Sequence, residues 1–152
     1  GKAVCVVRDS GNSLLAAWMM AKRGMLPVLL FSGKLGKEEA LDAAEQLGKW
    51  LPGLSFETYP TDVIGTQRKL LEAACVLAGA TGANCVVTGE LFSEVSSPGT
   101  LPALEEDLPL PVFRPLIGFG EQMLADYLST AGFKSPAGNP PPANSLNAPA
   151  RK

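Results

Sequence analysis

A short polar loop, RDSGNS at residues 8–13, lies between a buried-looking strand and a helix that opens with small and apolar residues. Such a corner builds an anion site, because backbone N–H groups and the positive end of the helix point at the ligand. Ser10, Gly11 and Ser13 are the residues that could take part. Ser, Gly and Asn also occur at such corners only to cap the helix, and Asn12 or Ser10 could have that role here. The loop alone leaves both interpretations open.

The elements around this loop alternate between short apolar runs and longer segments of helical spacing. Five apolar runs separated by helices indicate an α/β fold with a mostly parallel sheet, since parallel strands covered on both faces read as continuous apolar runs. Ligands of such folds bind beyond the carboxyl ends of the strands. The expected strands are 3–7, 27–32, 54–60, 84–89 and 110–115, and the expected helices are 13–23, 36–50, 65–80, 99–107 and 119–131.

The length and composition predict one globular domain followed by a tail. The chain has 152 residues, of which 46% are hydrophobic and 18% charged, enough for a sizeable core. The net charge of −2 argues against a stand-alone nucleic-acid binder, which normally carries a basic excess. We expect the domain to occupy residues 1–133. Residues 134–152, rich in Pro, Ala and Asn, are expected to form a flexible tail.

The sequence contains three cysteines and no histidine. Cys5 and Cys85 lie in strand-like runs and Cys75 lies in a helical pattern, so all three are expected to be buried. No CxxC pair indicates zinc, and reduced thiols predict a cytoplasmic protein. The lack of histidine removes the most common general base. No apolar run is long enough to predict a membrane span, so no membrane partner is expected.

A second stretch, VVTGELFSEVSSPGTLPALEEDLPLPVFRPLIG at residues 86–118, closely resembles the PP-loop domain of the tRNA 4-thiouridine sulfurtransferase (ThiI) family. That family has a strand ending in TGE, a polar turn and a run ending in LPVLRPLIG. The segment AAWMMAKRG, residues 16–24, looks like the helix after the family's pyrophosphate loop. The resemblance covers residues 3–132. It implies a Rossmann-like, adenine nucleotide alpha hydrolase-like three-layer sandwich with a mostly parallel five-stranded sheet.

The resemblance also implies a chemistry. In that family ATP is split to AMP and pyrophosphate, AMP activates an oxygen of a tRNA uridine, and sulfur then replaces this oxygen. The family's loop has the pattern SGGxDS, and with the two sequences aligned on AAW only Ser13 matches it. Arg8 stands at the first Ser and Asn12 at the Asp. Asp9 and Ser10 stand at the two Gly.

These differences bear on phosphate binding. Glycine lets the backbone approach a phosphate closely, and side chains at Asp9 and Ser10 obstruct that approach. A carboxylate about 4 Å from a phosphate charge repels it by roughly 4 kcal/mol at an effective dielectric constant of about 20. Arg8 could offset this by pairing with Asp9 or with a phosphate. Asn12 cannot supply the carboxylate that would help hold Mg²⁺. We therefore expect ATP or AMP to bind, with or without Mg²⁺, and little turnover.

The resemblance places further candidate nucleotide-binding residues at strand ends. Gly89 and Glu90 end the fourth strand, where the family's nucleotide pocket lies, although a strand-end turn with a solvated carboxylate is the alternative. Arg114 could face an anion or form a salt bridge to a carboxylate such as Glu90. Phe31 and Ser32 end the second strand, where related domains read adenine with backbone groups, although Phe31 is most simply a core residue. The full candidate set is Arg8, Ser10, Gly11, Asn12, Ser13, Phe31, Ser32, Gly89, Glu90 and Arg114.

Two other polar groups are expected to face solvent. Gln67 and Arg68 lie where the family has two arginines on the helix after the third strand, and a surface position is favoured for both. The acidic run Glu105, Glu106 and Asp107 is most simply a solvated turn.

Three functions are consistent with these observations. The first is a degenerate PP-loop domain that binds ATP or AMP, and the second is an active adenylating ATPase. The third is a non-catalytic scaffold or assembly subunit, which would form a homodimer. The family's RNA-binding modules are missing, as is its sulfur-accepting cysteine, because residues 133–152 contain no Cys. We therefore expect another chain to supply RNA binding or sulfur transfer.

Overall fold

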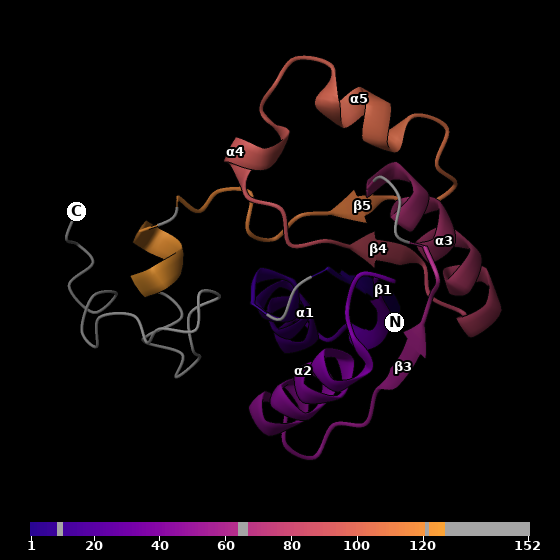
Figure 1. Cartoon of the computed structure of the whole chain (residues 1–152), viewed down its shortest axis with the longest axis vertical. Coiled ribbons are helices and arrows are strands. Elements are labelled where there is room, and N and C mark those ends of the chain that lie inside the picture. The colour runs from indigo at the N-terminus through magenta and orange to yellow at the C-terminus, as the bar shows by residue number, and fades with distance from the viewer. Residues whose placement is uncertain (9–10, 64–66, 121, 127–152) are drawn as a thin grey trace.

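The computed structural model describes residues 1–8, 11–63, 67–120 and 122–126. Five strands form one sheet in the order β3-β2-β1-β4-β5, and every pairing is parallel (Figure 1). The parallel five-stranded sheet expected from the apolar runs is confirmed. The strands are β1 (Lys2–Val7), β2 (Leu26–Phe31), β3 (Glu57–Pro60), β4 (Cys85–Val87) and β5 (Val112–Phe113).

Helices cover both faces of this sheet and complete a three-layer sandwich. The helices are α1 (Asn12–Lys22), α2 (Lys37–Trp50), α3 (Gln67–Thr81), α4 (Phe92–Val95) and α5 (Thr100–Glu105). Residues of α1 and α2 pack on one face of the sheet. Residues of α3 and α5 pack on the other, as Figure 1 shows. The expected three-layer architecture is therefore confirmed.

The central strand β1 shows why the apolar runs are continuous. Val4 and Val6 belong to the core under α3, whereas Ala3, Cys5 and Val7 belong to the core under α1. Both faces of the strand are therefore buried, and no polar alternation is possible. β2, the next strand along the chain, pairs with one edge of β1, and β4 pairs with the other edge. The carboxyl end of β1, where the polar loop begins, thus lies at the switch point of the sheet, where ligands of such folds bind.

The edge strands are shorter than the sequence predicts. The run 54–60 forms a strand only at β3, and the run 110–115 forms only the two residues of β5. Pro111 and Pro115 bracket β5, and proline has no N–H to donate to a ladder. The four-residue helix α4 was not predicted. Its first turn is closed by Glu94, whose Oε1 accepts a hydrogen bond from the Leu91 N–H at 2.8 Å.

The start of α1 also differs from expectation. The helix begins at Asn12, its N-cap is Gly11, and no side chain caps it. The interpretation of Asn12 as the cap is therefore wrong, and that of Ser10 lies outside the described residues. Of the final helix expected over 119–131, the structure describes residues 122–126 as helical. The expected tail, 134–152, lies outside the described residues.

All three cysteines are free and buried, as expected. Burial raises the pKa of the Cys5 thiol to about 12, and the neighbouring Cys85 adds to this rise through its charge. Burial likewise raises the pKa of Cys75 and Cys85. In the described part of the chain, no helix has the length and apolar character needed to cross a bilayer.

We expect Leu71→Ala to lower the free energy of unfolding by about 2–5 kcal/mol, measured by urea denaturation, because it removes a side chain with 0% exposure. Val76→Ala, in the same helix but 75% exposed, is the matched control and should change stability by less than about 0.5 kcal/mol. Equal effects of the two substitutions would contradict this packing of α3.

The thiols should resist alkylation in the folded protein. The raised pKa of Cys5 lowers its thiolate fraction at pH 8 by roughly a thousandfold relative to an ordinary thiol, and the thiolate is the reactive form. Mass spectrometry after iodoacetamide treatment should find Cys5 unlabelled in buffer and labelled in urea. Rapid labelling of Cys5 in buffer would show that this core is more open than described.

Candidate functional site

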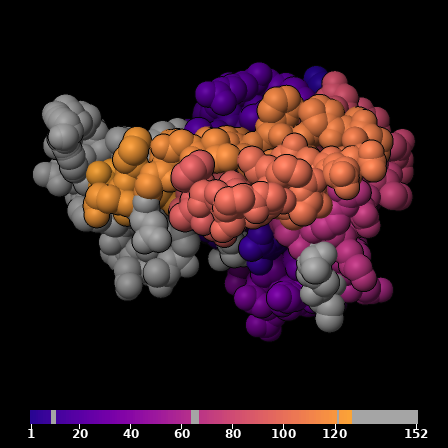
Figure 2. All heavy atoms as spheres, turned by 90° about the horizontal axis from the view of Figure 1, so that it is seen from above, coloured from indigo at the N-terminus to yellow at the C-terminus, as the bar shows by residue number. Residues whose placement is uncertain are grey.

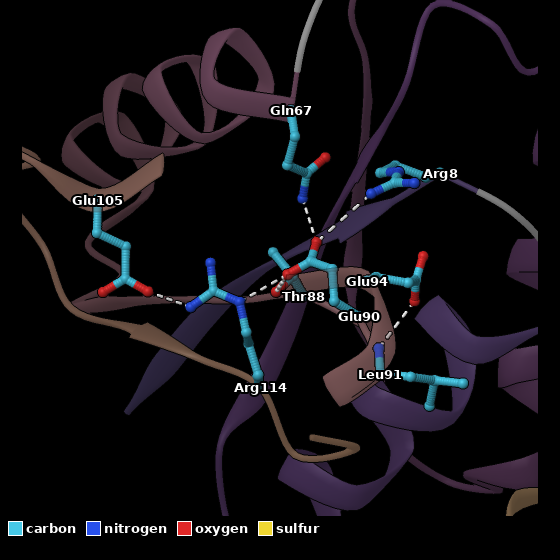
Figure 3. Close-up of polar contacts among 8 residues, drawn as sticks. All are labelled: Arg8, Gln67, Thr88, Glu90, Leu91, Glu94, Glu105 and Arg114. Carbon is cyan, nitrogen blue, oxygen red and sulfur yellow. Dashed lines mark hydrogen bonds and ion pairs between the residues drawn. The ribbon is translucent and has the colours of Figure 1, made fainter. Parts of the chain in front are cut away.

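The carboxylate of Glu90 lies at the centre of a polar cluster beyond the carboxyl ends of the strands (Figure 3). Glu90 is only 4% exposed. Its Oε1 accepts hydrogen bonds from Arg114 Nε and from the Thr88 hydroxyl, both at 2.7 Å. The Gln67 amide donates to Oε2, and Arg8 Nη1 lies 3.5 Å from the same oxygen. Each of these partners comes from a different segment of the chain.

The pairing with Arg114 makes the burial of Glu90 tolerable. A buried carboxylate is strongly unfavourable unless it is paired and hydrogen-bonded. The Arg114 side chain is itself 5% exposed, and its Nη1 donates to Glu105 as well. Arg114 therefore connects β4 to the end of α5. The salt bridge to Glu90, considered as one of two roles for Arg114, is present, and the expectation that Glu105 is merely solvated is wrong.

Gln67 and Arg68, at the start of α3, both bind other segments of the chain. Gln67 bonds to Glu90, and Arg68 Nη1 donates to the carbonyl oxygens of Leu104, at 3.1 Å, and Glu106. The expected surface position is therefore wrong for Gln67, whereas Arg68 stays partly exposed and also pairs with Glu72 on the helix surface. Gln67 holds the central carboxylate, and Arg68 binds carbonyls at the end of α5 that the helix itself leaves without donors.

The polar loop meets the TGE segment at the start of α1. The Arg8 N–H donates to Ser13 Oγ at 3.2 Å, and Ser13 is 4% exposed. A Cβ at Gly89 would lie 2.8 Å from backbone atoms of Asn12 and Ser13. The end of β4 therefore packs directly against the first turn of α1, and only glycine fits there. The structure thus brings together two segments that are distant in the sequence.

The space left at this junction is small. Its volume is about 10 Å³, close to that of one water molecule. The residues that line it are Val6, Arg8, Ser13, Thr88, Gly89, Glu90 and Glu94. Arg8 and Glu90 both line this hollow, and Arg8 Nη1 lies 3.5 Å from Glu90 Oε2.

Phe31 and Ser32 lie apart from this cluster. Phe31 is 7% exposed and belongs to the core under α1, as the simplest interpretation of the sequence has it. The Ser32 N–H donates to the Val7 carbonyl at 2.9 Å, and the Ser32 carbonyl accepts from the Leu35 N–H at 3.0 Å. These backbone groups hold the fold, and neither Phe31 nor Ser32 lines the small hollow.

The described residues contain no ready-made cluster of three ligands for a metal ion such as Mg²⁺. Magnesium prefers carboxylate oxygens in octahedral geometry. No group of three His, Cys, Asp or Glu residues lies together within the described ranges, and the first turn of α1 contains no acidic residue. The Glu90 oxygens already accept bonds from protein donors.

The candidate residues from the sequence divide into three groups. Arg8, Ser13, Gly89 and Glu90 line one hollow, and Arg114 binds Glu90 beside it. Gly11 and Asn12 form the start of α1, and Ser10 lies outside the described residues. Sequence reasoning did not single out Thr88, and it placed Glu105 in solvent rather than against Arg114. Thr88 stands in the TGE motif, one residue beyond β4, and that position was the available signal. Nucleotide contact by these residues stays a prediction.

A wider, apolar hollow lies between the start of α4 and the segment after β5. Its volume is about 380 Å³. It is lined by Leu91, Phe92, Ser93, Ile117, Gly118, Phe119 and Gly120. Figure 2 shows the chain from α4 to the segment after β5 extending along one face of the molecule. Exposed apolar side chains accompany it, since Phe92 is 61% and Met123 is 53% exposed.

Comparison with known proteins identifies the relatives of this fold. Residues 56–130 match the family model described as "Thiamine biosynthesis protein (ThiI)". A probable tRNA sulfurtransferase of Saccharolobus solfataricus is 31% identical over 153 aligned positions, which cover 87% of this chain and 41% of the relative. A probable tRNA sulfurtransferase of Sulfurisphaera tokodaii is 29% identical, with 87% and 42% covered. The chain thus spans about two fifths of the length of these relatives.

Solved structures share the fold. A 4-thiouridine synthetase in complex with RNA and ATP superposes with a TM-score of 0.68 at 24% identity, covering 87% of this chain and 41% of that one. A protein of Methanocaldococcus jannaschii, described as a predicted subunit of tRNA methyltransferase, superposes with a TM-score of 0.52 at 21% identity, covering 85% and 76%. The resemblance expected from TGE and RPLIG is thereby confirmed: residues 56–130 match the ThiI family model, and the chain is related to the tRNA sulfurtransferases.

Proposed function

We propose that this chain binds an adenine nucleotide at the start of α1 with little or no release of pyrophosphate. The observation that carries the proposal is the position of Arg8, whose side chain is 37% exposed at the small hollow beside Ser13. A guanidinium group and the positive end of a helix both attract a phosphate. Arg8 and α1 therefore present positive charge at the switch point of the sheet.

The comparisons support this assignment at the level of the family. The related 4-thiouridine synthetase is described with bound ATP and RNA, and the longer relatives are described as tRNA sulfurtransferases. Because this chain spans about two fifths of those relatives, the activity of a whole sulfurtransferase is not assigned to it.

We propose that ATP is not cleaved because the residues around the hollow offer few ligands to a Mg²⁺ ion. AMP-forming chemistry needs the charge of a polyphosphate to be neutralised, usually with Mg²⁺. Asn12 offers an amide oxygen where a carboxylate would bind the ion more strongly, and Glu90 is committed to Arg114, Thr88 and Gln67. These residues therefore favour binding of the nucleotide over its cleavage.

We expect Arg8→Ala to weaken nucleotide binding by roughly 10- to 100-fold in calorimetric titration, because a charge-assisted hydrogen bond contributes about 1.5–3 kcal/mol. Arg23→Ala is the matched control, since Arg23 is exposed at the opposite end of α1. It should leave the affinity unchanged. A pyrophosphate-release assay on the unchanged protein should give no signal above buffer.

Two results would contradict the proposal in different ways. Steady release of pyrophosphate from ATP would favour the active adenylating enzyme. Folded protein can also be titrated with AMP and with ATP, each with and without Mg²⁺. If none of these titrations gave heat, the proposal of nucleotide binding would be contradicted.

A non-catalytic assembly subunit is the second candidate, and the apolar face favours it. Phe92 lines the apolar hollow and is 61% exposed, and Phe113 on β5 and Met123 are 47% and 53% exposed. The Methanocaldococcus jannaschii protein of similar fold is itself described as a predicted subunit. This candidate predicts a stable dimer in solution together with no nucleotide binding, which light scattering and calorimetry would measure on one sample.

We expect Arg114 to stabilise the fold, whichever of these functions the protein has. Arg114→Ala leaves Glu90, at 4% exposure, without its buried cationic partner, so the free energy of unfolding should fall by about 3–5 kcal/mol in urea denaturation. Arg23→Ala again serves as the control and should change it by less than about 0.5 kcal/mol. A loss below about 1 kcal/mol for Arg114→Ala would show that the Glu90 cluster does not stabilise the sheet.

A further inference from the structure

We propose that residues 99–107, which we call the strap, detach from the domain as a unit while the sheet stays folded, and that this opening uncovers Arg114. The strap contains α5 and forms part of the connection between β4 and β5. Its contacts with Arg68 and Arg114, which lie outside it, hold it closed. The proposal concerns contacts within the chain, so it is independent of the proposed nucleotide binding.

The strap has few apolar contacts with the rest of the domain. A connection between parallel strands is usually a helix that packs on the sheet. In Figure 1, α5 lies above β5 and beside α3, and it contains no buried residue, whereas five residues of α1 are buried. Leu104 packs against the core under α3 and is only half-buried. Segments with few buried apolar contacts are those that open locally.

A residue with positive φ lies at each end of the strap. Gly99, before α5, has a φ of 84°, and Asp107, after α5, has a φ of 58°. Asp107 is the one residue other than glycine with positive φ in the described part of the chain. This conformation is unfavourable for a residue with a Cβ, whereas glycine adopts it readily. Opening therefore relieves strain at one end of the strap and turns about a permissive residue at the other.

Arg68, on α3, holds the carboxyl end of α5. Its Nη1 donates to the carbonyl oxygens of Leu104, at 3.1 Å, and of Glu106. Its Nε donates to Glu72 Oε2 at 2.9 Å, a pair within α3 that does not involve the strap. Because the Arg68 side chain is 28% exposed, water can take the place of the two carbonyls when the strap opens.

Arg114 is the group that the opening uncovers. Its Nη1 donates to Glu105 in the strap, and its Nε donates to Glu90 at 2.7 Å (Figure 3). Its Nη2 is buried and has no hydrogen-bond partner. Once Glu105 moves away with the strap, neither Nη group has a partner in the protein, while Nε keeps Glu90. The buried carboxylate stays paired, so the edge of the sheet is preserved.

Native-state hydrogen exchange of the full chain, measured by NMR, tests the opening. The Ala103 and Glu106 amides donate to backbone carbonyls within the strap and report on it. The Val4 and Val6 amides, in the buried strand β1, report on global unfolding. We expect the strap amides to exchange at least about 100-fold faster, at a rate that low concentrations of urea leave unchanged. Exchange of both sets at one rate, with one urea dependence, would contradict local opening.

Arg68→Met tests the first contact. It removes the donors to the two carbonyls and keeps the apolar part of the side chain, so exchange of the strap amides should rise about 10- to 100-fold. Glu72→Gln is the matched control, because it changes the partner of Arg68 within α3, and it should alter this exchange by less than about twofold. Equal effects of the two substitutions would show that the carbonyl bonds do not hold the strap.

Leu47→Ala separates local opening from global unfolding. Leu47 is 0% exposed, lies on α2 in the core under α1, and stays buried whether the strap is open or closed. Its truncation should therefore speed exchange of the β1 amides at least tenfold or so and leave exchange of the strap amides unchanged. Equal acceleration of both sets would mean that the strap exchanges only when the whole domain unfolds, which would overturn the proposal.

Modification of arginine by phenylglyoxal, located by mass spectrometry, tests what the opening uncovers. The Arg114 side chain is 5% exposed, so we expect it to react at least about tenfold more slowly than the exposed Arg23. In Arg68→Met its reaction should accelerate by the same factor as the exchange of the strap amides. If the strap amides accelerated while Arg114 stayed protected, the strap would open without uncovering this arginine, and that part of the proposal would be wrong.

Discussion

The buried carboxylate of Glu90 is the constraint on which the carboxyl edge of the sheet depends. A charge taken out of water must be matched by donors, and this one is matched by Arg8, Gln67, Thr88 and Arg114. These donors follow β1, begin α3, follow β4 and follow β5. One desolvated group therefore fixes where separate segments of the chain meet. Because the pairing needs no ligand, the sheet can keep its shape whether or not the site performs chemistry.

The sequence was sufficient for the architecture and for part of the site. Continuous apolar runs predicted the parallel sheet because β1 is buried on both faces, and the TGE and RPLIG segments located Glu90 and Arg114. The errors have a common cause. A carboxylate or amide in a polar segment is solvated by default, so nothing local indicated that Gln67 and Glu105 bind buried partners. Those contacts depend on which strand ends become neighbours, which is a property of the folded sheet.

Interactions within the fold already engage several residues that the sequence nominated as nucleotide-binding. The Ser32 backbone, which the resemblance nominated to read adenine, is bonded to Val7 and Leu35. The tight contact of Gly89 with Asn12 leaves space close to that of one water at the helix start. A ligand must therefore compete with contacts inside the protein, and its affinity is the difference between two sets of interactions. Phe92, by contrast, is 61% exposed, and its exposed ring is the reason that a protein partner is the second candidate.

The loop departs from the glycine-rich SGGxDS pattern: Asp9 and Ser10 stand at its two Gly, and Arg8 stands at its first Ser. Backbone N–H groups in a cradle spread positive potential over several phosphate oxygens, whereas Arg8 is one cation that already faces an internal anion, Glu90. If Arg8 turned toward an anion, Glu90 would keep its bonds from Arg114, Thr88 and Gln67, so no buried charge would lose all its partners. Arg8 is therefore the member of the cluster that can be given to a ligand at the smallest cost to the fold.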